Sequence, residues 1–482
     1  MADAGFYMLA CVPVLLLATG LPAFMVLILV AAGFAAFGVL VHAIPYEFLT
    51  ALPQRIVGLL ELDIIQALPL YVLMGALLNR LPLADILFRA GNALFARTSA
   101  APLLSALGLG AMLAPMNGSV GASVATLSRI VLPRLKAHRV SETDGLAAVC
   151  VASTLGVVVP PSLVLILLAD AMLTAHTVAM NLTGHIVRAI NTQDVFRGAL
   201  PPAAIFLALA GLLAWRLGRR AGPAGAFVPP AERLKPREWA VAAATLLFVV
   251  GLLAAVVAGY VYPVEAAAAG GMALFVIGLA SRTLTPKVLA AALRDTMAVT
   301  GALFALFVGA TTFTLVVRAF GTDLVITALI QGIPGGPLAA VLAVMLALWL
   351  CAFALDAFEI IFVVVPLVMP ALLTRVENPV WVAVLALLSL QASFLLPPLG
   401  YAVMMARTMA AARVALGPLV RALLPFLAAQ LVVLGLTLAF PGLVRLALPE
   451  EPAGFAPAHK MTPEQAEQQL LKELPPPPDD SK

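Results

Sequence analysis

The chain has 482 residues, of which 63% are hydrophobic and only 11% are charged. One water-soluble core could not bury this much apolar surface, so the composition excludes a soluble globular protein and favours a helical membrane protein. The net charge of +4 says little by itself, because the basic residues of a membrane protein sort by side of the membrane.

Apolar runs near the length of a membrane-spanning helix follow one another along the chain. In chain order they are 6–21, 22–40, 62–80, 146–172, 199–217, 239–258, 263–281, 297–317, 380–405 and 421–447. Two further apolar stretches, 100–133 and 338–373, carry a polar or charged residue at mid-length and are too short for two comfortable spans. We expect these two to be re-entrant hairpins in an all-α, multi-pass integral membrane protein.

The two halves of the chain repeat one pattern of marker residues. The matching positions are Ser119 with Asp356, Pro133 with Pro370, and Pro160-Pro161 with Pro397-Pro398, all 237 residues apart. Each copy would hold five spans and one hairpin. Because five is odd, the second copy must be inverted in the membrane relative to the first, an architecture typical of secondary transporters.

The predicted organisation is therefore a first repeat (1–217), a cytoplasmic linker (218–238), a second repeat (239–447) and a soluble, largely disordered tail (448–482). Hairpin 100–133 and broken helix 146–172 belong to the first repeat, and hairpin 338–373 and broken helix 380–405 to the second. With the Arg-rich linker in the cytoplasm, most Lys and Arg residues fall on that side and both termini fall outside it.

The Pro-Pro pairs interrupt otherwise apolar runs. Proline removes a backbone donor and leaves an earlier carbonyl without its partner, which lipid cannot satisfy but a cation or an enclosed cavity can. Small or polar residues precede each pair: Ser153, Thr154 and Gly156 in the first half, Gln391 and Ser393 in the second. The alternative is a pair of kinks that serve only packing.

The hairpin centres carry the other candidate binding residues. Asn117-Gly118-Ser119 forms either a binding tip or an ordinary turn between packed helices. Asp356 is harder to explain structurally, because an unpaired acid in hydrocarbon costs about 3 kcal/mol. Glu359, one turn later, pairs with Asp356 through a water or faces a wet cavity.

These motifs together resemble a known family. NGSVGA from Asn117, STLGVVVPPS from Ser153, GYVYPVEAAAAG from Gly259, FALDAFEII from Phe353 and SFLLPPLG from Ser393 occur in the order and spacing of one family of permeases. It is the large membrane subunit of tripartite ATP-independent periplasmic (TRAP) transporters. The resemblance extends to about Ala447.

The resemblance implies a function, partners and a place in the cell. It implies a sodium-coupled, elevator-type importer of organic anions, usually carboxylates, in the bacterial inner membrane. A small four-helix membrane subunit and a periplasmic solute-binding protein would be its partners, beside membrane lipid. Sodium ions would be the only coupling metal, held by backbone carbonyls and polar side chains. We expect no enzymatic activity, no cofactor, and neither nucleotide nor nucleic acid as a partner, and no GxxxxGK[ST] phosphate loop occurs.

The family's site carries over onto this chain position by position. The implied substrate- and sodium-binding residues are Asn117, Gly118, Ser119, Ser153, Thr154, Gly156, Pro160, Pro161, Ser162, Asp356, Gln391, Ser393, Pro397, Pro398 and Gly400. Two motifs depart from the usual family pattern, Asn117 at the first tip and Leu396 before the second proline pair. The second change removes a hydroxyl, whose oxygen Ser393 or Gln391 would replace if the ion site is kept.

Two other functions stay open at this stage. One is a stand-alone two-hairpin anion/sodium symporter without a binding protein, and the other is an intramembrane enzyme that uses Asp356 or a histidine. We also expect a periplasmic loop around 173–197, with His176, His185, Arg188 and Arg197, which contacts the binding protein or forms a solvated amphipathic helix.

Overall fold

Every regular element in the part of the chain that the structure describes is a helix, as the sequence predicts. The computed structural model describes residues 3–117, 119–160, 162–184, 190–220, 234–396, 400–410 and 414–448. Seven helices in these ranges are long and apolar enough to cross a membrane, or eight if the bent pair Tyr46–Leu60 and Ile65–Arg80 is one span. The protein is therefore a multi-pass membrane protein.

The first half of the chain runs from α1 to α11. Its elements are α1 (Asp3–Thr19), α2 (Ala23–Leu40), α3 (Tyr46–Leu49), α4 (Leu52–Leu60), α5 (Asp63–Arg80), α6 (Leu83–Leu94), α7 (Ala101–Leu113), the 3-10 turn η1 (Ala114–Asn117), α8 (Val120–Ala137), α9 (Glu142–Val158), α10 (Leu163–Thr183) and α11 (Thr192–Arg220).

The second half runs from α12 to α22. Its elements are α12 (Pro236–Ala258), α13 (Pro263–Ala280), α14 (Pro286–Ala319), α15 (Thr322–Gln331), α16 (Gly336–Cys351), α17 (Ala357–Glu359), the π-helical turn η3 (Ile360–Val364), α18 (Val365–Leu373), α19 (Pro379–Leu395), α20 (Tyr401–Met409), α21 (Leu416–Ala439) and α22 (Gly442–Arg445).

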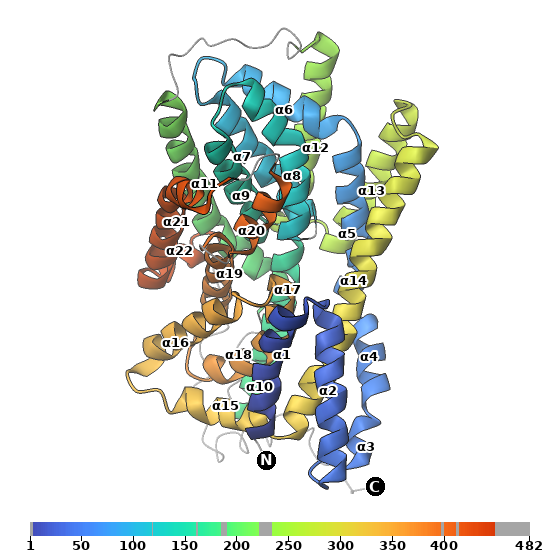
Figure 1. Ribbon diagram of the computed structural model, residues 1–482, viewed down its shortest axis with the longest axis vertical. Coiled ribbons are helices and arrows are strands. Elements are labelled where there is room, and N and C mark those ends of the chain that lie inside the picture. Colours follow the sequence, from blue (N-terminus) through green and yellow to red (C-terminus); the bar gives the residue numbers. More distant parts are fainter. Residues whose placement is uncertain are drawn as a thin grey trace, which may run out of the picture.

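Long helices form one side of the molecule. On the right of Figure 1, α14 packs along α2 and α5, and α13 packs along α5. These helices are apolar around most of their circumference and leave large side chains such as Leu29, Met272 and Met297 exposed. A helix that exposes such side chains is stable in lipid, so this side of the molecule has a surface suited to the membrane interior.

The opposite side is built around two buried helices, α9 and α19. Every residue of α19 and every residue of α9 from Gly145 onward is buried, and the two helices pack against each other. Both have 17 residues, and adding 237 to both ends of α9 gives both ends of α19. The helix ends therefore keep the spacing that the sequence markers predict.

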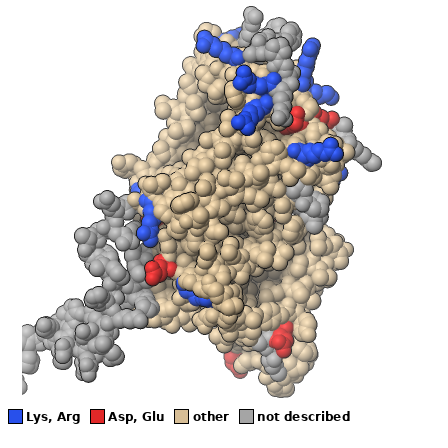
Figure 2. Space-filling view, turned by 90° about the vertical axis from the view of Figure 1, so that its left-hand side faces the viewer, with Lys and Arg blue, Asp and Glu red and all other residues tan. Residues whose placement is uncertain are grey.

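Basic residues collect at one end of the molecule. Figure 2 shows Lys and Arg gathered at its top, where α11 ends and α12 begins, while the N-terminus lies at the opposite end in Figure 1. Arg216 and Arg219 on α11 and Arg237 on α12 belong to this end.

The segment 173–197, expected to be a loop or a solvated amphipathic helix, is helical in its first part. Helix α10 continues to Thr183, eleven residues past the expected end of the span at 172. His176 lies inside this helix and is buried, so it is not solvated. Arg197 lies in α11, where its guanidinium donates to the carbonyls of Val257 and Ala258, while His185 and Arg188 fall outside the described residues.

Candidate functional site

The first proline pair separates α9 from α10. Helix α9 ends at Val158, Val159 and Pro160 are not helical, and Pro161 falls outside the described residues. Ser162 starts the next helix: its hydroxyl accepts from the Leu165 N–H at 3.0 Å and donates to the Val157 carbonyl at 3.2 Å. The Ser162 side chain thus bridges the break and satisfies backbone groups on both sides of it.

The first hairpin tip is the junction of η1 and α8. Ser119 is the N-cap of α8, where its hydroxyl accepts from the Ala122 N–H at 3.1 Å. Asn117 is buried at the end of η1, and its Oδ1 accepts a hydrogen bond from Nδ2 of Asn79 at the end of α5. Gly118 falls outside the described residues.

The tip and the break enclose a small cavity of about 10 Å³. Its lining comes from η1, α8, α9 and the start of α10: Ala114, Pro115, Ser119, Val120, Ser123, Ser153, Gly156, Leu163 and Val164. The volume suits one water-sized occupant. Three predicted site residues, Ser119, Ser153 and Gly156, therefore lie around one space.

The oxygens around this cavity suit a hard cation. The single hydroxyl proton of Ser123 is shared between the carbonyls of Ser119, at 3.0 Å, and Ala114, at 3.3 Å, and Ser153 donates to the Val149 carbonyl at 2.7 Å. Each hydroxyl that donates to a carbonyl keeps its own lone pairs, so the lining offers neutral oxygen ligands. Such ligands are the ones that alkali and alkaline-earth cations prefer.

Gly156 permits this close arrangement. A Cβ atom at position 156 would lie 2.5 Å from the Ala114 carbonyl oxygen and 2.9 Å from the Ala114 Cβ. Only glycine lets α9 approach η1 this closely. Thr154, like Ser153, donates to a carbonyl of its own helix, that of Val151, but it does not line the cavity.

The second hairpin tip places two acids one turn apart. Asp356 is the N-cap of α17, and its backbone N–H donates to Oε2 of Glu359 at 3.0 Å. The Glu359 carboxylate thus caps the backbone of the tip, and its predicted pairing with Asp356 through a water, or its exposure to a wet cavity, stays a prediction. The Asp356 Oδ1 atom is buried and has no hydrogen-bond partner among the described residues.

The second break differs from the first in its polar groups. Helix α19 ends at Leu395 and α20 begins at Tyr401, while Pro397 and Pro398 fall outside the described residues. Gln391 is 0% exposed, and within the described ranges neither its Oε1 nor its Nε2 has a partner. Ser393 donates to the Leu390 carbonyl at 2.7 Å, which leaves the lone pairs of its hydroxyl oxygen available.

Gly400 closes the second break. Its N–H donates to the Leu396 carbonyl at 2.8 Å, and a Cβ there would lie 2.6 Å from the Phe394 carbonyl oxygen and 2.9 Å from that of Leu396. The carbonyl oxygens of Phe394 and Leu396 therefore both lie close to the Cα atom of Gly400, and any larger residue at position 400 would displace them.

The two halves of the site meet through residues that the sequence did not single out. The Cys150 thiol on α9 donates to the Ala402 carbonyl on α20 at 3.6 Å. A Cβ at Gly121 on α8 would lie 2.7 Å from the Tyr401 hydroxyl. The second break therefore lies against the first hairpin and the first broken helix, and α10 packs against both η1 and α17.

Several site residues were missed from the sequence. Ala114 contributes only its carbonyl, which no side-chain pattern reveals, and Asn79 lies 38 positions before its partner Asn117. Ser123 had a signal: it lies four residues after Ser119, so the two share one face of a helix.

This arrangement of helices and small polar cavity defines a class of protein, a helical membrane transporter with two interrupted helices. A family comparison then identifies it further. The model of the tripartite ATP-independent periplasmic transporter, DctM component, matches residues 10–443, so the chain belongs to that family. The resemblance seen in the sequence motifs is confirmed.

Named relatives agree with this assignment. The chain is 24% identical over 392 residues to the C4-dicarboxylate TRAP transporter large permease protein DctM of Pseudomonas aeruginosa, covering 80% of this chain and 85% of that one. It is also 24% identical over 447 residues to the sialic acid TRAP transporter large permease protein SiaM of Vibrio cholerae, covering 91% and 97%. These relatives are permeases and not enzymes.

A solved structure shares the fold. The YdaH transporter of Alcanivorax borkumensis, whose crystal structure was described as having an unusual topology, matches with a TM-score of 0.57 and 18% sequence identity. The match covers 82% of this chain and 88% of that chain. At this identity the likeness concerns the fold alone.

Proposed function

We propose that the chain is the permease subunit of a sodium-coupled importer of a small organic acid. The observation that carries the proposal is the small cavity between the first hairpin tip and the first helix break. Hydroxyl oxygens of Ser119, Ser123 and Ser153 surround it in a protein of the TRAP permease family. Neutral oxygens around a space for one small occupant suit sodium better than a divalent cation, because no carboxylate lines it.

Membrane voltage makes this coupling energetically sufficient. Moving one elementary charge through 100 mV is worth about 2.3 kcal/mol. Two sodium ions carried with one monovalent anion move one net positive charge, so voltage drives the import even before a sodium gradient is counted. No nucleotide-driven motor is required.

We further propose an inverted repeat that moves as an elevator. Equal lengths and equally spaced ends of α9 and α19 support two copies of one unit. The five spans per copy predicted from the sequence would require inversion. The hairpins and the two broken helices would form the transport domain. The layer of α2, α5, α13 and α14 would form the static scaffold.

Partners and location follow from the family. The proposed partners are a small four-helix membrane subunit and a periplasmic solute-binding protein, in the bacterial inner membrane. The cluster of Lys and Arg where α11 ends and α12 begins supports a cytoplasmic position for that end. The substrates named for the relatives, C4-dicarboxylates and sialic acid, define the first acids to test.

Uptake in proteoliposomes tests the proposal. The full chain is reconstituted with the small subunit, and uptake of labelled succinate and labelled sialic acid is measured with and without binding protein. Replacing external sodium by potassium should abolish uptake. Uptake of the same size in potassium would contradict sodium coupling.

The same assay separates the two alternatives. Uptake that does not require any binding protein would favour a stand-alone symporter. Intact transport by the Asp356→Asn variant, together with loss of a covalent conversion of the substrate, would favour an intramembrane enzyme.

A further inference from the structure

A second, larger cavity lies away from the proposed sodium site. It has a volume of about 390 Å³ and lies between the end of α5, the start of α6 and the second half of α8. Small-molecule sites commonly have 300–1,000 Å³, so the cavity is large enough for a small organic acid. Arg129, Pro133 and Ala137 of its lining are exposed, which shows that the cavity is open to the outside of the protein.

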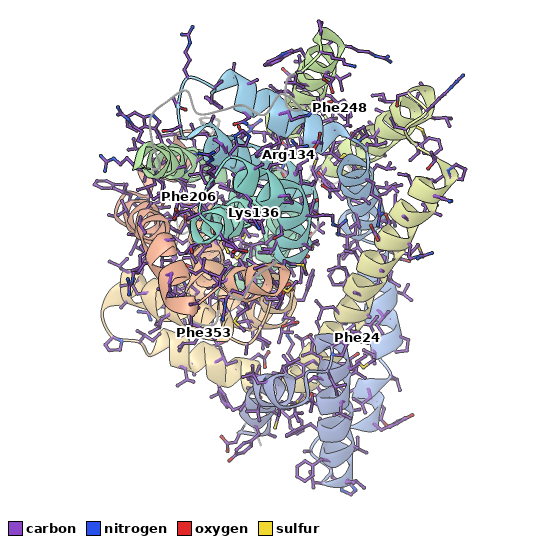
Figure 3. The ribbon with its side chains drawn as sticks, turned by 45° about the horizontal axis from the view of Figure 1, so that its top comes forward. Phe24, Arg134, Lys136, Phe206, Phe248 and Phe353 are labelled. Atoms are coloured by element: carbon purple, nitrogen blue, oxygen red, sulfur yellow. The ribbon has the colours of Figure 1, made fainter. Side chains whose placement is uncertain are left out.

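Charges around this cavity do not balance. Asp85 on α6 pairs with two guanidinium groups, that of Arg89 at 3.1 Å and that of Arg134 on α8. Arg89 also bonds to Glu238 at 2.6 Å, and this hydrogen bond raises the pKa of Arg89. Figure 3 shows Arg134 on α8 beside α6, where its guanidinium also lies 5.8 Å from the centre of the Phe88 ring.

Arg129 is the basic group left over. The two carboxylates of this cluster are bonded to Arg89 and Arg134, and no described carboxylate lies within ion-pair distance of Arg129. Its side chain lines the cavity one to two turns from Arg134. A guanidinium in this position binds a carboxylate through two parallel N–H donors.

The inner wall of the cavity reaches the hairpin tip. Asn79 lines the cavity and donates to Oδ1 of Asn117, which is 6% exposed. The remaining amide groups, Oδ1 of Asn79 and Nδ2 of Asn117, are buried without a partner in the part of the chain that the structure describes. Asn117 is not part of the cavity lining, so the cavity is connected to the hairpin tip through the Asn79 side chain.

We propose that this cavity binds the transported organic acid at the Lys- and Arg-rich end of the protein, with Arg129 bonded to its carboxylate and Asn79, which is fixed by its hydrogen bond to Asn117, in the inner wall. The inference rests on the proposed function for the direction of transport, but the binding site itself does not depend on sodium coupling. Apolar lining by Leu81, Ala84 and Ile130 suits an organic acid better than inorganic phosphate or sulfate, which have no apolar surface to bury.

Binding to the purified full chain tests the inference. The melting temperature is measured against sodium salts of acetate, pyruvate, succinate and sialic acid, with chloride, sulfate and phosphate at equal ionic strength as the inorganic arm. At least one organic acid should stabilise the wild type more than any inorganic anion. For that acid, Arg129→Gln should weaken binding about ten-fold or more, the loss expected for a charged hydrogen-bond donor.

Two further variants make the result specific. Arg139→Gln removes a guanidinium that follows α8 but does not line the cavity, so its affinity for the acid should match the wild type. Arg129→Lys should recover part of the affinity, because it keeps the charge without the paired donors. This rescue separates loss of binding from a loss of folding.

The outcomes decide between the inference and the proposed function. Unchanged affinity in Arg129→Gln, equal stabilisation by inorganic anions, or no stabilisation by any acid in the panel would each overturn the inference. If Arg129→Gln loses binding while wild-type uptake proves independent of sodium, the cavity is an organic-acid site and only the proposed coupling fails.

Discussion

The two helix breaks share a backbone design but differ in the polar groups beside it. At the first break, between α9 and α10, the hydroxyls of Ser119, Ser153 and Ser162 are all hydrogen-bonded around or beside a cavity of about 10 Å³. At the second break, between α19 and α20, Gln391 holds buried polar atoms without a partner among the described residues, and so does Asp356 at the second hairpin tip.

This difference teaches that α9 and α19 share their length and spacing but not the polar groups at their C-terminal ends. The helix ends recur at the same spacing because the apolar runs and prolines recur. The first break is surrounded by neutral hydroxyls that are already hydrogen-bonded. In the second half, the Asp356 carboxylate and the Gln391 amide have buried atoms whose partners a bound ion or water would supply.

Removing the charge of Asp356 should have the largest effect. In Asp356→Asn we expect sodium-dependent uptake to fall about 100-fold, since losing one partner of a buried charged interaction costs about 3 kcal/mol. Initial rates in proteoliposomes measure it. The control is Asp295→Asn, whose carboxylate is half-exposed and pairs with Arg80 at 2.5 Å, and which should change uptake by less than about two-fold. Near-normal uptake by Asp356→Asn would show that the carboxylate only stabilises the hairpin tip and does not contribute to transport.

Filling the close contact at the first break should come next. Gly156→Ala would force η1 away from α9 at a cost of about 2 kcal/mol, or about 30-fold in sodium affinity if the strain opens the cavity. Sodium titration of uptake measures the loss of sodium affinity, and the melting temperature measures the loss of stability. Gly108→Ala on α7, where a Cβ would meet nothing within 4 Å, is the matched control and should be neutral or stabilising. Equal behaviour of both variants would show that the cavity does not bind the ion.

A third test concerns the amide at the second break. Gln391→Leu should raise the sodium concentration for half-maximal uptake about ten-fold without lowering the melting temperature, because the amide has no partner to lose among the residues that the structure describes. Gln430→Leu on α21 is the control: its Nε2 donates to the Leu388 carbonyl at 3.2 Å, so it should lose stability and keep sodium affinity. A more stable Gln391→Leu variant with unchanged sodium dependence would exclude the amide as a ligand.

The smallest effect is expected at the first cavity. Ser153→Ala removes one hydroxyl ligand and should weaken sodium affinity about five-fold, equivalent to about 1 kcal/mol. Ser105→Ala removes an identical bond, from the hydroxyl to the carbonyl four residues earlier at 2.7 Å, at a buried position that does not line the cavity. Sodium dependence that changes equally in both variants would count against a site at Ser153.

Much of the fold followed from the sequence because lipid restricts the choice of structure. The apolar runs predicted from 22–40 and 263–281 correspond to α2 and α13 within one residue at each end. The run predicted from 421–447 is displaced, because α21 begins five residues earlier, at Leu416, and ends eight residues earlier, at Ala439. The run at 297–317 covers only part of α14, which begins at Pro286, because its first turns are amphipathic and not uniformly apolar. The all-helical class and the family are confirmed, whereas the binding residues stay predictions.

The site was less predictable because its ligands are defined by distance and not by residue type. Ser119, Ser153 and Gly156 were named from the motifs and meet around one cavity, but Ala114 and Ser123 complete it. Thr154 was named with equal reason, yet it does not line the cavity. At the first break the serine hydroxyls are hydrogen-bonded, whereas at the second the Gln391 amide has no partner among the described residues. The sequence did not reveal this difference.

By itself the sequence determined that this chain is helical, embedded in a membrane and interrupted twice at prolines, because backbone groups in lipid must be bonded within a helix wherever proline permits. Tertiary structure alone decided which oxygens converge, which amides lack partners and which guanidinium keeps its charge uncompensated. These properties depend on contacts between elements far apart in the chain, such as Asp85 with Arg134 or Asn79 with Asn117, and no local pattern encodes such contacts.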